Sequence, residues 1–271
     1  MKVFVFDLDK CNGCHNCQIA CKDEHAGNDW SPYALPQPDT GQFWCKVDEE
    51  VCGKVPHVRV NYLPRLCNHC DEAPCRAASP EAVRKRDDGL VLIDPAEAGA
   101  RELVDACPYG AIFWNEELAI PQKCTGCAHL VDAGEAPHCV DVCPHGALRF
   151  GDEEDLAEEI AAAEALVPGR AEADRPRVHY LNLPRRFLAG VVVDPEADEV
   201  VPGARVTAEN LATGEVLATE ADEFGDFWFH QVGAAGWRVY AEAEGYLTRV
   251  LEASTVDEDR NMGPIELYRA G

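Results

Sequence analysis

The fourteen cysteines of this chain all lie in its first 143 residues, and most of them fall into short, regularly spaced runs. The first run has the spacing C-x2-C-x2-C-x3-C and consists of Cys11, Cys14, Cys17 and Cys21. Three thiolates at this spacing wrap around one iron–sulfur cluster, while the fourth points away and, in two-cluster proteins, binds the other cluster. A complementary run is therefore expected downstream, and it consists of Cys124, Cys127, Cys139 and Cys143.

A middle run also begins with three closely spaced cysteines, but some of the ligands expected after them are missing. It contains Cys67, Cys70 and Cys75, with Ser79 where a fourth cysteine would stand. Cys107-Pro108 has the ending of such a run, but the three positions expected before it hold Glu97, Ala100 and Leu103. Because paired runs exchange their fourth ligands, all four absences belong to one cluster. The sequence therefore predicts three clusters and one lost site.

The exchange rule assigns twelve thiolates to iron in three sets. The first cluster is expected to bind Cys11, Cys14, Cys17 and Cys143. The second cluster is expected to bind Cys21, Cys124, Cys127 and Cys139. The third cluster is expected to bind Cys67, Cys70, Cys75 and Cys107. Zinc ribbons also use C-x2-C pairs, but a tetrahedral zinc site does not require three closely spaced cysteines and a fourth that binds elsewhere. A disulfide framework is disfavoured because the chain is long and no secretory peptide is expected at its start.

Several residues near these runs are not assigned to clusters. Cys45 and Cys52 are expected to be packed or free thiols, with a disulfide as the alternative. His15, His69 and His129 stand beside ligands and are interpreted as structural, so no catalytic residue is predicted. Apolar neighbours are expected to wall off the clusters from water, and these are Ile19, Ile112, Trp114 and Leu148.

The pattern along the chain predicts an α+β protein of two domains. A double, nested, bacterial-ferredoxin-like cluster domain is expected over residues 1–169, ending in a helix over 152–166. A basic linker over 170–186 is expected to lead into a seven-stranded β-sandwich over 187–271, where Trp228 and Trp237 belong to the core. The expected strands are 187–193, 204–210, 216–220, 227–230, 237–243, 247–253 and 265–268.

The charge balance limits the class of partner. Lys and Arg total 24 against 49 Asp and Glu, which gives a formal net charge of −25. Nucleic acid is therefore not expected as a partner, and a basic protein face or a salt-adapted host would explain the acidity. The longest aliphatic run of the back half, over residues 188–193, is too short to span a bilayer. A cytoplasmic location is the default expectation.

The nested runs with exchanged fourth ligands resemble the iron–sulfur (small or beta) subunits of molybdopterin oxidoreductases. Within that superfamily, the loss of one cluster and the sandwich after the ferredoxin part resemble the small subunits of pyrogallol–phloroglucinol transhydroxylases. The matching stretches are CHNCQIACKDEH (14–25), GLVLIDP (89–95), CPYGAIFWNEE (107–117), QKCTGCAHL (122–130) and PRVHYLNL (176–183).

This resemblance implies three [4Fe-4S] clusters and a transthyretin or carboxypeptidase-regulatory-like tail. It also implies a large catalytic partner subunit that alone holds a molybdenum or tungsten bis-molybdopterin cofactor, in heterodimers that can pair into a dimer of heterodimers. The expected function is electron transfer within a molybdopterin enzyme that acts on polyhydroxylated aromatics by hydroxyl transfer, hydroxylation or dehydroxylation. Two alternatives stay open: a subunit of a respiratory reductase fed by a quinol-oxidising anchor, and a free-standing carrier whose sandwich docks it to partners.

Overall fold

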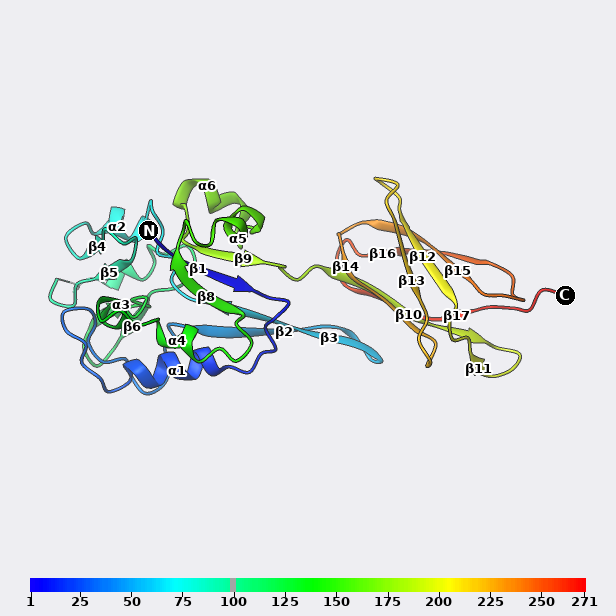
Figure 1. Cartoon of the computed structure of the whole chain (residues 1–271), viewed down its shortest axis with the longest axis horizontal. Helices are drawn as coiled ribbons and strands as arrows, with labels where there is room; N and C mark the ends of the chain where they lie inside the picture. Colours follow the sequence, from blue (N-terminus) through cyan, green and yellow to red (C-terminus); the bar gives the residue numbers. More distant parts are fainter. Residues whose placement is uncertain (98–100) are drawn as a thin grey trace. The chain divides into compact units, whose positions relative to one another are not determined.

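The computed structural model describes residues 1–97 and 101–271 and divides the chain into two compact units (Figure 1). The first unit comprises residues 1–49 and 62–183, and the second comprises residues 50–61 and 184–271. Each unit has its own buried apolar cluster, one around Phe4, Phe6 and Leu92 and the other around Leu188, Phe227 and Trp237. Ala100, one of the positions assigned to the lost site, lies outside the described residues.

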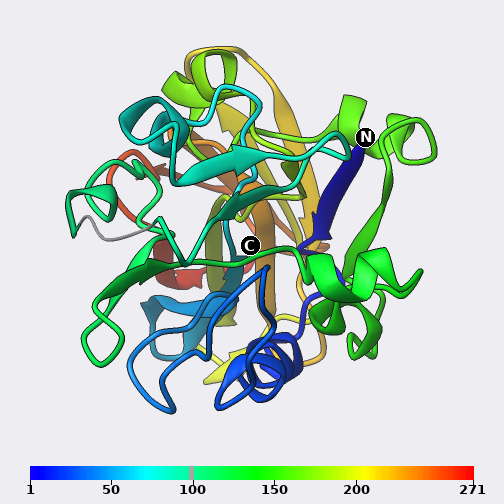
Figure 2. The ribbon, with the colours of Figure 1, turned by 90° about the vertical axis from the view of Figure 1, so that its left-hand side faces the viewer.

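A three-stranded sheet ties the two ends of the first unit together. Its central strand is β1 (Lys2–Asp7), in which five of six residues are buried. It pairs antiparallel with β8 (Leu148–Asp152) and parallel with β9 (Val178–Leu181). Figure 2 shows β1 in blue beside the N-terminus. Because β1 is buried on both faces, its sequence is a continuous apolar run, VFVF, rather than an alternating one.

Short elements complete the first unit around this sheet. The helices are α1 (Asn16–His25), α2 (Pro74–Ala78), η1 (Arg101–Leu103), α3 (Ala128–Asp132), α4 (His138–Asp141), α5 (Ala157–Ala162), η2 (Pro168–Arg170) and α6 (Ala171–Asp174). Two small hairpins join β4 (Val83–Lys85) to β5 (Val91–Ile93) and β6 (Phe113–Asn115) to β7 (Ile120–Gln122). None of the helices in the described part of the chain has the length and apolarity that a bilayer crossing requires.

The second unit packs two four-stranded sheets. The first has the order β11–β10–β14, with β17 also paired to β10, and the second has the order β13–β12–β15–β16. The strands are β10 (Arg186–Asp194), β11 (Glu199–Val200), β12 (Arg205–Asn210), β13 (Val216–Glu220), β14 (Asp226–Val232), β15 (Gly236–Glu242), β16 (Arg249–Ser254) and β17 (Arg260–Glu266). In the second sheet, buried residues alternate with partly buried or exposed ones along β12 and β15, as expected of a sandwich. Trp237 is buried in this core, whereas Trp228 is only partly buried beside Phe187.

Local differences from the predicted elements have simple causes. The sequence did not predict β11, and β17 begins earlier than the expected strand because its parallel pairing with β10 starts at Arg260. The helix predicted over 152–166 is reduced to α5, since pairing of Asp152 with Lys2 extends β8. The predicted linker over 170–186 contains α6 and β9, so most of it belongs to the first unit.

A hairpin from the first half of the chain contributes to the second unit. It consists of β2 (Lys46–Lys54) and β3 (His57–Arg65), and its tip, residues 50–61, groups with the sandwich strands. The His57 side chain is buried there, with Nδ1 3.1 Å from Asn261 Oδ1 and Nε2 3.2 Å from Asp226 Oδ1. The tip was expected in the range 1–169; its burial against the sandwich strands is a tertiary contact that strand pattern does not reveal.

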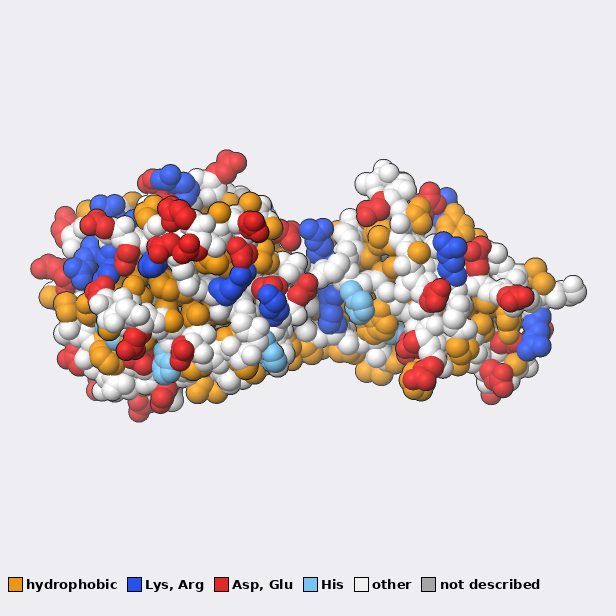
Figure 3. Space-filling view, in the orientation of Figure 1, with side chains coloured by type: hydrophobic (Ala, Val, Ile, Leu, Met, Phe, Trp, Pro, Cys, Tyr) orange, Lys and Arg blue, Asp and Glu red, His pale blue; other side chains and the backbone are white. Residues whose placement is uncertain are grey.

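Acidic side chains are spread over the visible surface of both units, with Lys and Arg side chains among them (Figure 3). Several cations pair with these acids, for example Arg86 with Asp88 and Asp132. The buried Arg177 side chain, in the segment predicted as a linker, binds Asp71 through two nitrogens and Glu153 through a third. On the face shown, acidic side chains therefore occur on both units and not on one segment alone.

We expect Thr255→Val to destabilise the sandwich by about 2 kcal/mol, because it leaves buried donors without an acceptor. Thr255 is fully buried, and its hydroxyl oxygen accepts hydrogen bonds from the Trp237 indole (2.9 Å) and the Ala235 N–H (3.2 Å). In calorimetry of the full chain, the sandwich transition should fall by about 10 °C. The exposed Thr248→Val is the matched control, and an equal effect of both variants would contradict this interpretation.

Candidate iron–sulfur site

The C-x2-C loops that begin at Cys11, Cys67 and Cys124 share one backbone geometry. The residue before the second cysteine has a positive φ in each: 69° at Gly13, 44° at His69 and 66° at Gly126. This turn directs the N–H of His69 toward Cys67 Sγ (3.4 Å) and that of Gly126 toward Cys124 Sγ (3.3 Å). Glycine reaches such a conformation without strain. Hydrogen bonds from the backbone to sulfur stabilise the thiolate, which is the form that binds iron.

The two C-P-x-G corners also repeat each other. Gly110 and Gly146 have φ values of 62° and 60°, and their N–H groups donate to the carbonyls of Cys107 (3.1 Å) and Cys143 (3.3 Å). Each corner leads into a short apolar stretch in which Ile112 or Leu148 is only 3% exposed. The repeat seen in the sequence is thus one structural unit used twice.

Mutual repulsion groups the twelve thiols into three sets. The pKa of Cys11 is raised by burial and by the first-set thiols Cys17, Cys14 and Cys143. The pKa of Cys21 is raised well above its usual value by burial and by the second-set thiols Cys124, Cys139 and Cys127. Burial likewise raises the pKa of Cys70, with repulsion from the third-set thiols Cys67, Cys107 and Cys75. The assignment of these sets to three clusters stays a prediction.

The second set lies between the other two. Cys67 of the third set raises the pKa of Cys124 of the second, after the larger effect of burial, so these two sets are neighbours. The Cys45 thiol forms hydrogen bonds with Cys139 of the second set and Cys17 of the first. All four cysteines of the second set are buried, whereas Cys14 of the first set is exposed. The order is therefore first, second, third, with the most enclosed set in the middle.

The chemistry of this donor set fits iron–sulfur clusters. Bringing four ionised thiols together in a buried space is unfavourable unless a cation offsets their repulsion. All fourteen cysteines are free thiols in the structure, so no disulfide removes that repulsion. Among the described residues, no group of three or more His, Cys, Asp or Glu side chains forms a site for a single metal ion. Soft thiolates are the ligands that iron–sulfur clusters select.

Leu103, one of the positions predicted for the lost site, lies in apolar packing. Leu103 is 3% exposed and packs in one cluster with Cys70, Cys75 and Ile112. Ser79 ends α2, where its N–H donates to the Cys75 carbonyl (3.1 Å), and Glu97 is exposed. Leucine in this core removes both a thiolate and the space beside it, so the described residues offer no substitute ligands.

Cys45 contacts cysteines of two sets, which the sequence analysis did not predict. It is 1% exposed, and its hydrogen bonds raise its own pKa, which keeps it a neutral thiol donor. The hydrogen bond from Cys45 is also the main reason that the pKa of Cys17 falls to about 7. Cys52 is buried in the second unit beside Phe187 and Ala189. Nothing in the local spacing distinguishes these two cysteines, because only the fold places Cys45 between two ligand sets.

The histidines beside the runs have defined structural partners. His15 Nε2 lies 2.8 Å from Glu49 Oε1, and His129 Nε2 lies 2.9 Å from Glu24 Oε1 while its ring stacks on Trp30. His25, which the sequence analysis did not single out, is 2% exposed with Nε2 3.8 Å from Cys127 Sγ. Burial and the nearby His129 and His138 lower its pKa to about 3, so its ring is neutral.

One expected wall residue does not bury a cluster. Ile19 is 62% exposed, because on α1 it lies two positions from both Cys17 and Cys21 and so faces away from them. Ile112 and Leu148 are buried as expected, and Trp114 is partly buried.

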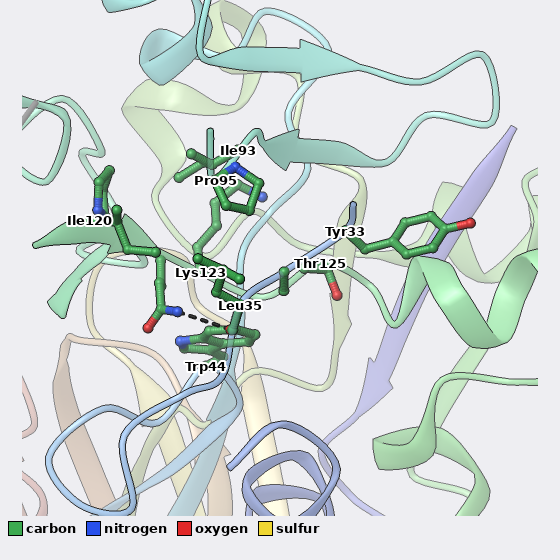
Figure 4. Close-up of a pocket in the computed structure, with 11 residues that line it drawn as sticks. Tyr33, Leu35, Trp44, Ile93, Pro95, Ile120, Lys123 and Thr125 are labelled. Atoms are coloured by element: carbon green, nitrogen blue, oxygen red, sulfur yellow. Dashed lines mark hydrogen bonds between the residues drawn. The ribbon is translucent and has the colours of Figure 1, made fainter. Parts of the chain in front are cut away.

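A small cavity of about 20 Å³ lies beside Lys123 (Figure 4). Its lining includes Trp44, Ile93 and Thr125, and Gln122 closes one side by donating to the Leu35 carbonyl (3.0 Å). Lys123 itself is 3% exposed. Burial lowers the pKa of Lys123, but the thiolates of Cys67, Cys75 and Cys124 outweigh that effect and hold its pKa above the usual value. A buried ammonium thus stands among ligands of two sets.

Two protein families match separate parts of the chain. The 4Fe-4S dicluster domain family matches residues 58–153, and the carboxypeptidase regulatory-like domain family matches residues 188–263. The first match covers cysteines of the middle and last runs, and the second match covers most of the sandwich. The two family matches confirm the predicted order of the domains, an iron–sulfur domain followed by a carboxypeptidase-regulatory-like domain. The chain is therefore an iron–sulfur protein.

Relatives that match longer stretches define the family more closely. The chain is 36% identical over 267 residues to the pyrogallol hydroxytransferase small subunit of Pelobacter acidigallici, covering 93% of this chain and 96% of that one. It is 33% identical to a component of the anaerobic dimethyl sulfoxide reductase of Escherichia coli, covering 72% and 89%, and 31% identical to the beta subunit of the selenate reductase of Thauera selenatis, covering 50% and 62%. This protein belongs to the family of iron–sulfur small (beta) subunits of molybdopterin oxidoreductases.

If the chain binds the three clusters predicted from its sequence, Gly126→Ala should lower the iron content of the purified chain by about a third, because it disturbs the loop of one of them. A Cβ at Gly126 would lie 2.7 Å from Leu90 Cδ2, and Leu90 is 1% exposed and cannot move aside. The positive φ alone is tolerable, since His69 occupies the equivalent position of another loop.

Gly134→Ala is the matched control, because Gly134 also has a positive φ (83°) but nothing within 4 Å of its added Cβ. Iron per chain, measured by colorimetric assay, should stay at the unmodified level in this control. Full iron retention in Gly126→Ala would show that the clash is absorbed.

Proposed function

We propose that this chain carries electrons through three [4Fe-4S] clusters, each held by one of the three thiol sets. The first cluster binds Cys11, Cys14, Cys17 and Cys143; the second binds Cys21, Cys124, Cys127 and Cys139; the third binds Cys67, Cys70, Cys75 and Cys107. The observation that carries this proposal is the grouping of these thiols by mutual repulsion into three neighbouring sets. No residue of the chain is assigned a catalytic role.

The clusters supply one-electron redox chemistry, and the residues of this chain position and insulate them. The second set is enclosed, while the exposed Cys14 brings the first set to the surface. Burial and hydrogen bonds to sulfur are the means by which a protein adjusts cluster potentials. An ordered row of three sets, open at one end, suits transfer between a partner's redox centre and the interior of this chain.

We further propose that a large molybdopterin subunit is the partner and that the complex acts on a polyhydroxylated aromatic. The relative from Pelobacter acidigallici is named a hydroxytransferase small subunit, and similarity to it extends over 93% of the chain, including the sandwich. In the proposed complex the substrate and the molybdenum or tungsten cofactor belong to the partner, and two heterodimers can associate. The sandwich serves assembly in this proposal.

A respiratory reductase is the second candidate. It is favoured by the similarity to the reductase components of Escherichia coli and Thauera selenatis. Those similarities cover 72% and 50% of this chain, however, against 93% for the hydroxytransferase relative. The greater coverage, which includes the second unit, supports the first candidate.

The cluster count predicts about twelve irons per chain. Iron and acid-labile sulfide analysis of the anaerobically purified chain should give this value, and low-temperature electron paramagnetic resonance of the reduced protein should account for three spins. Bound zinc, or spins for four clusters, would overturn the proposed ligand sets.

Restoring the lost site should require all four ligands together. The combined variant Ser79→Cys, Glu97→Cys, Ala100→Cys and Leu103→Cys is expected to bind about four further irons, whereas each single substitution adds none. Leu103→Cys alone also opens the apolar core, so it is expected to lower stability by about 2 kcal/mol. A gain of iron in any single variant would contradict the assignment of these positions to one site.

Anaerobic purification from the native host tests the partner. A large molybdopterin-containing chain should copurify with this one, and the complex should act on a polyhydroxylated aromatic. Copurification with a quinol-oxidising membrane subunit would favour the reductase, and recovery of the chain alone would favour a free-standing carrier.

A further inference from the structure

A second cavity, of about 290 Å³, lies in the first unit between β9 and the segment that follows α5. Figure 1 shows α5 beside β9, and the Glu164 N–H holds the following segment on this strand by donating to the Tyr180 carbonyl (2.8 Å). The lining includes Val167, which is 39% exposed, and the exposed Arg175. The mouth of this cavity therefore lies at the surface of the unit.

Most of the cavity wall is apolar. Ile160 and Leu166 both line it, and each also packs against a buried apolar cluster of the unit. Pro176 and three alanines, Ala163, Ala165 and Ala171, complete this part of the wall. Such a wall favours an apolar group over a hydrated ion. Sites of about 300–1,000 Å³ hold drug-sized ligands, so a cavity of this volume suits a single ring.

Two polar side chains of the lining lack a hydrogen-bond partner within the described part of the chain. They are the amide of Asn68, a residue that is 5% exposed, and the partly buried ring of His179. Buried polar groups are normally paired, so these two are available to a ligand. Burial and the nearby Arg177 lower the pKa of His179, so its ring is neutral. A neutral imidazole and an amide each offer a donor and an acceptor.

The remaining polar groups of the lining favour a neutral ligand. The Tyr109 hydroxyl donates to Asp174 Oδ2 (3.0 Å), which leaves its oxygen free to accept a hydrogen bond from a ligand. The lining holds one charged side chain of each sign, Arg175 and Glu164, and both are exposed. The Arg175 guanidinium also binds the Glu72 carboxylate. Neither an anion nor a cation therefore finds an unbalanced charge here.

We propose that this cavity binds a hydroxylated aromatic ring. The aliphatic wall contacts the ring, and the Asn68 amide, the His179 ring and the Tyr109 oxygen bind its hydroxyl groups. A free phenol and the head group of a quinol both present this chemistry. The inference goes beyond the proposed function, because it gives this chain its own site for such a compound. It involves no redox step and does not depend on the assignment of thiols to clusters.

Calorimetric titration of the anaerobically purified full chain tests the site with three probes. Resorcinol represents a free phenol, and 2-decyl-1,4-benzenediol represents a quinol. Toluene is a ring of similar size without hydroxyl groups. At least one of the two diols should bind with a dissociation constant of about 1 mM or below. Toluene should bind at least about tenfold more weakly, because it leaves the polar side chains unpaired. The tighter of the two diols identifies the source of the ring.

Filling the cavity should abolish binding. Ala163→Trp places a large side chain in the lining, so the diol that binds the unmodified chain should no longer bind. Ala162→Trp is the matched control, because Ala162 is the neighbouring residue, is exposed and does not line the cavity. Its affinity should stay within about twofold of the unmodified value.

Removing the polar atoms of His179 should reverse the preference between ligands. His179→Phe keeps an aromatic ring but loses both nitrogens, so it should weaken diol binding by about tenfold while toluene binds at least as well as before. A merely structural role of His179 would weaken both ligands alike. His230→Phe, at an exposed histidine of the second unit, is the matched control and should change neither affinity.

Three outcomes would overturn the inference: binding of neither diol, equal affinity for toluene and the better diol, or unchanged binding in Ala163→Trp. Iron analysis of the same samples separates this failure from that of the proposed function. A chain with about twelve irons that binds no diol refutes the cavity site alone. A chain that binds the diol but lacks those irons refutes the proposed clusters and leaves the cavity site standing.

Discussion

Repulsion between buried thiolates is the constraint on which the first unit depends. Burial and neighbouring sulfurs raise the pKa of most cysteines in the three sets, and the four thiols of the second set are all enclosed. Such a core is stable only if cations bind between the thiolates and offset their repulsion. The small hairpins and short helices of the unit then serve to hold loops at fixed places around the sets, which explains why regular secondary structure is sparse there.

Three buried side chains lie between neighbouring sets of thiols. Cys45 lies between the first and second sets, and Lys123 and His69 lie between the second and third. Each of these side chains is buried, and none is a proposed ligand. The environment of the second set therefore includes residues outside its own cysteine runs, namely Cys45 and, from the loop of the third set, His69.

The second unit is built on a different principle, apolar packing between two sheets. Its buried polar exceptions are Thr255, Asp194, Asn210 and His57, and each has defined partners. Asp194 accepts hydrogen bonds from Tyr246 and Arg269, and its pKa falls to about 2 through backbone N–H donors, Tyr246 and Arg269. The tip of the β2–β3 hairpin joins this unit. The chain therefore passes between the units three times, which gives the sandwich more than a single covalent tether.

Spacing and strand alternation alone predicted the succession of an iron–sulfur domain and a sandwich, because both patterns are local in the sequence. The twelve-thiol pattern and the lost fourth site are predictions from the same spacing. Contacts between distant segments could not be predicted in this way. The apolar packing around Leu103 emerges only in the fold. Cys45 differs from Cys52 only by where the fold places it, Lys123 reaches another loop's ligand, and the predicted linker pairs with β1 because β9 completes a sheet. Tertiary structure decided these points, since hydrogen bonds to sulfur and sheet pairing join residues that no sequence period connects.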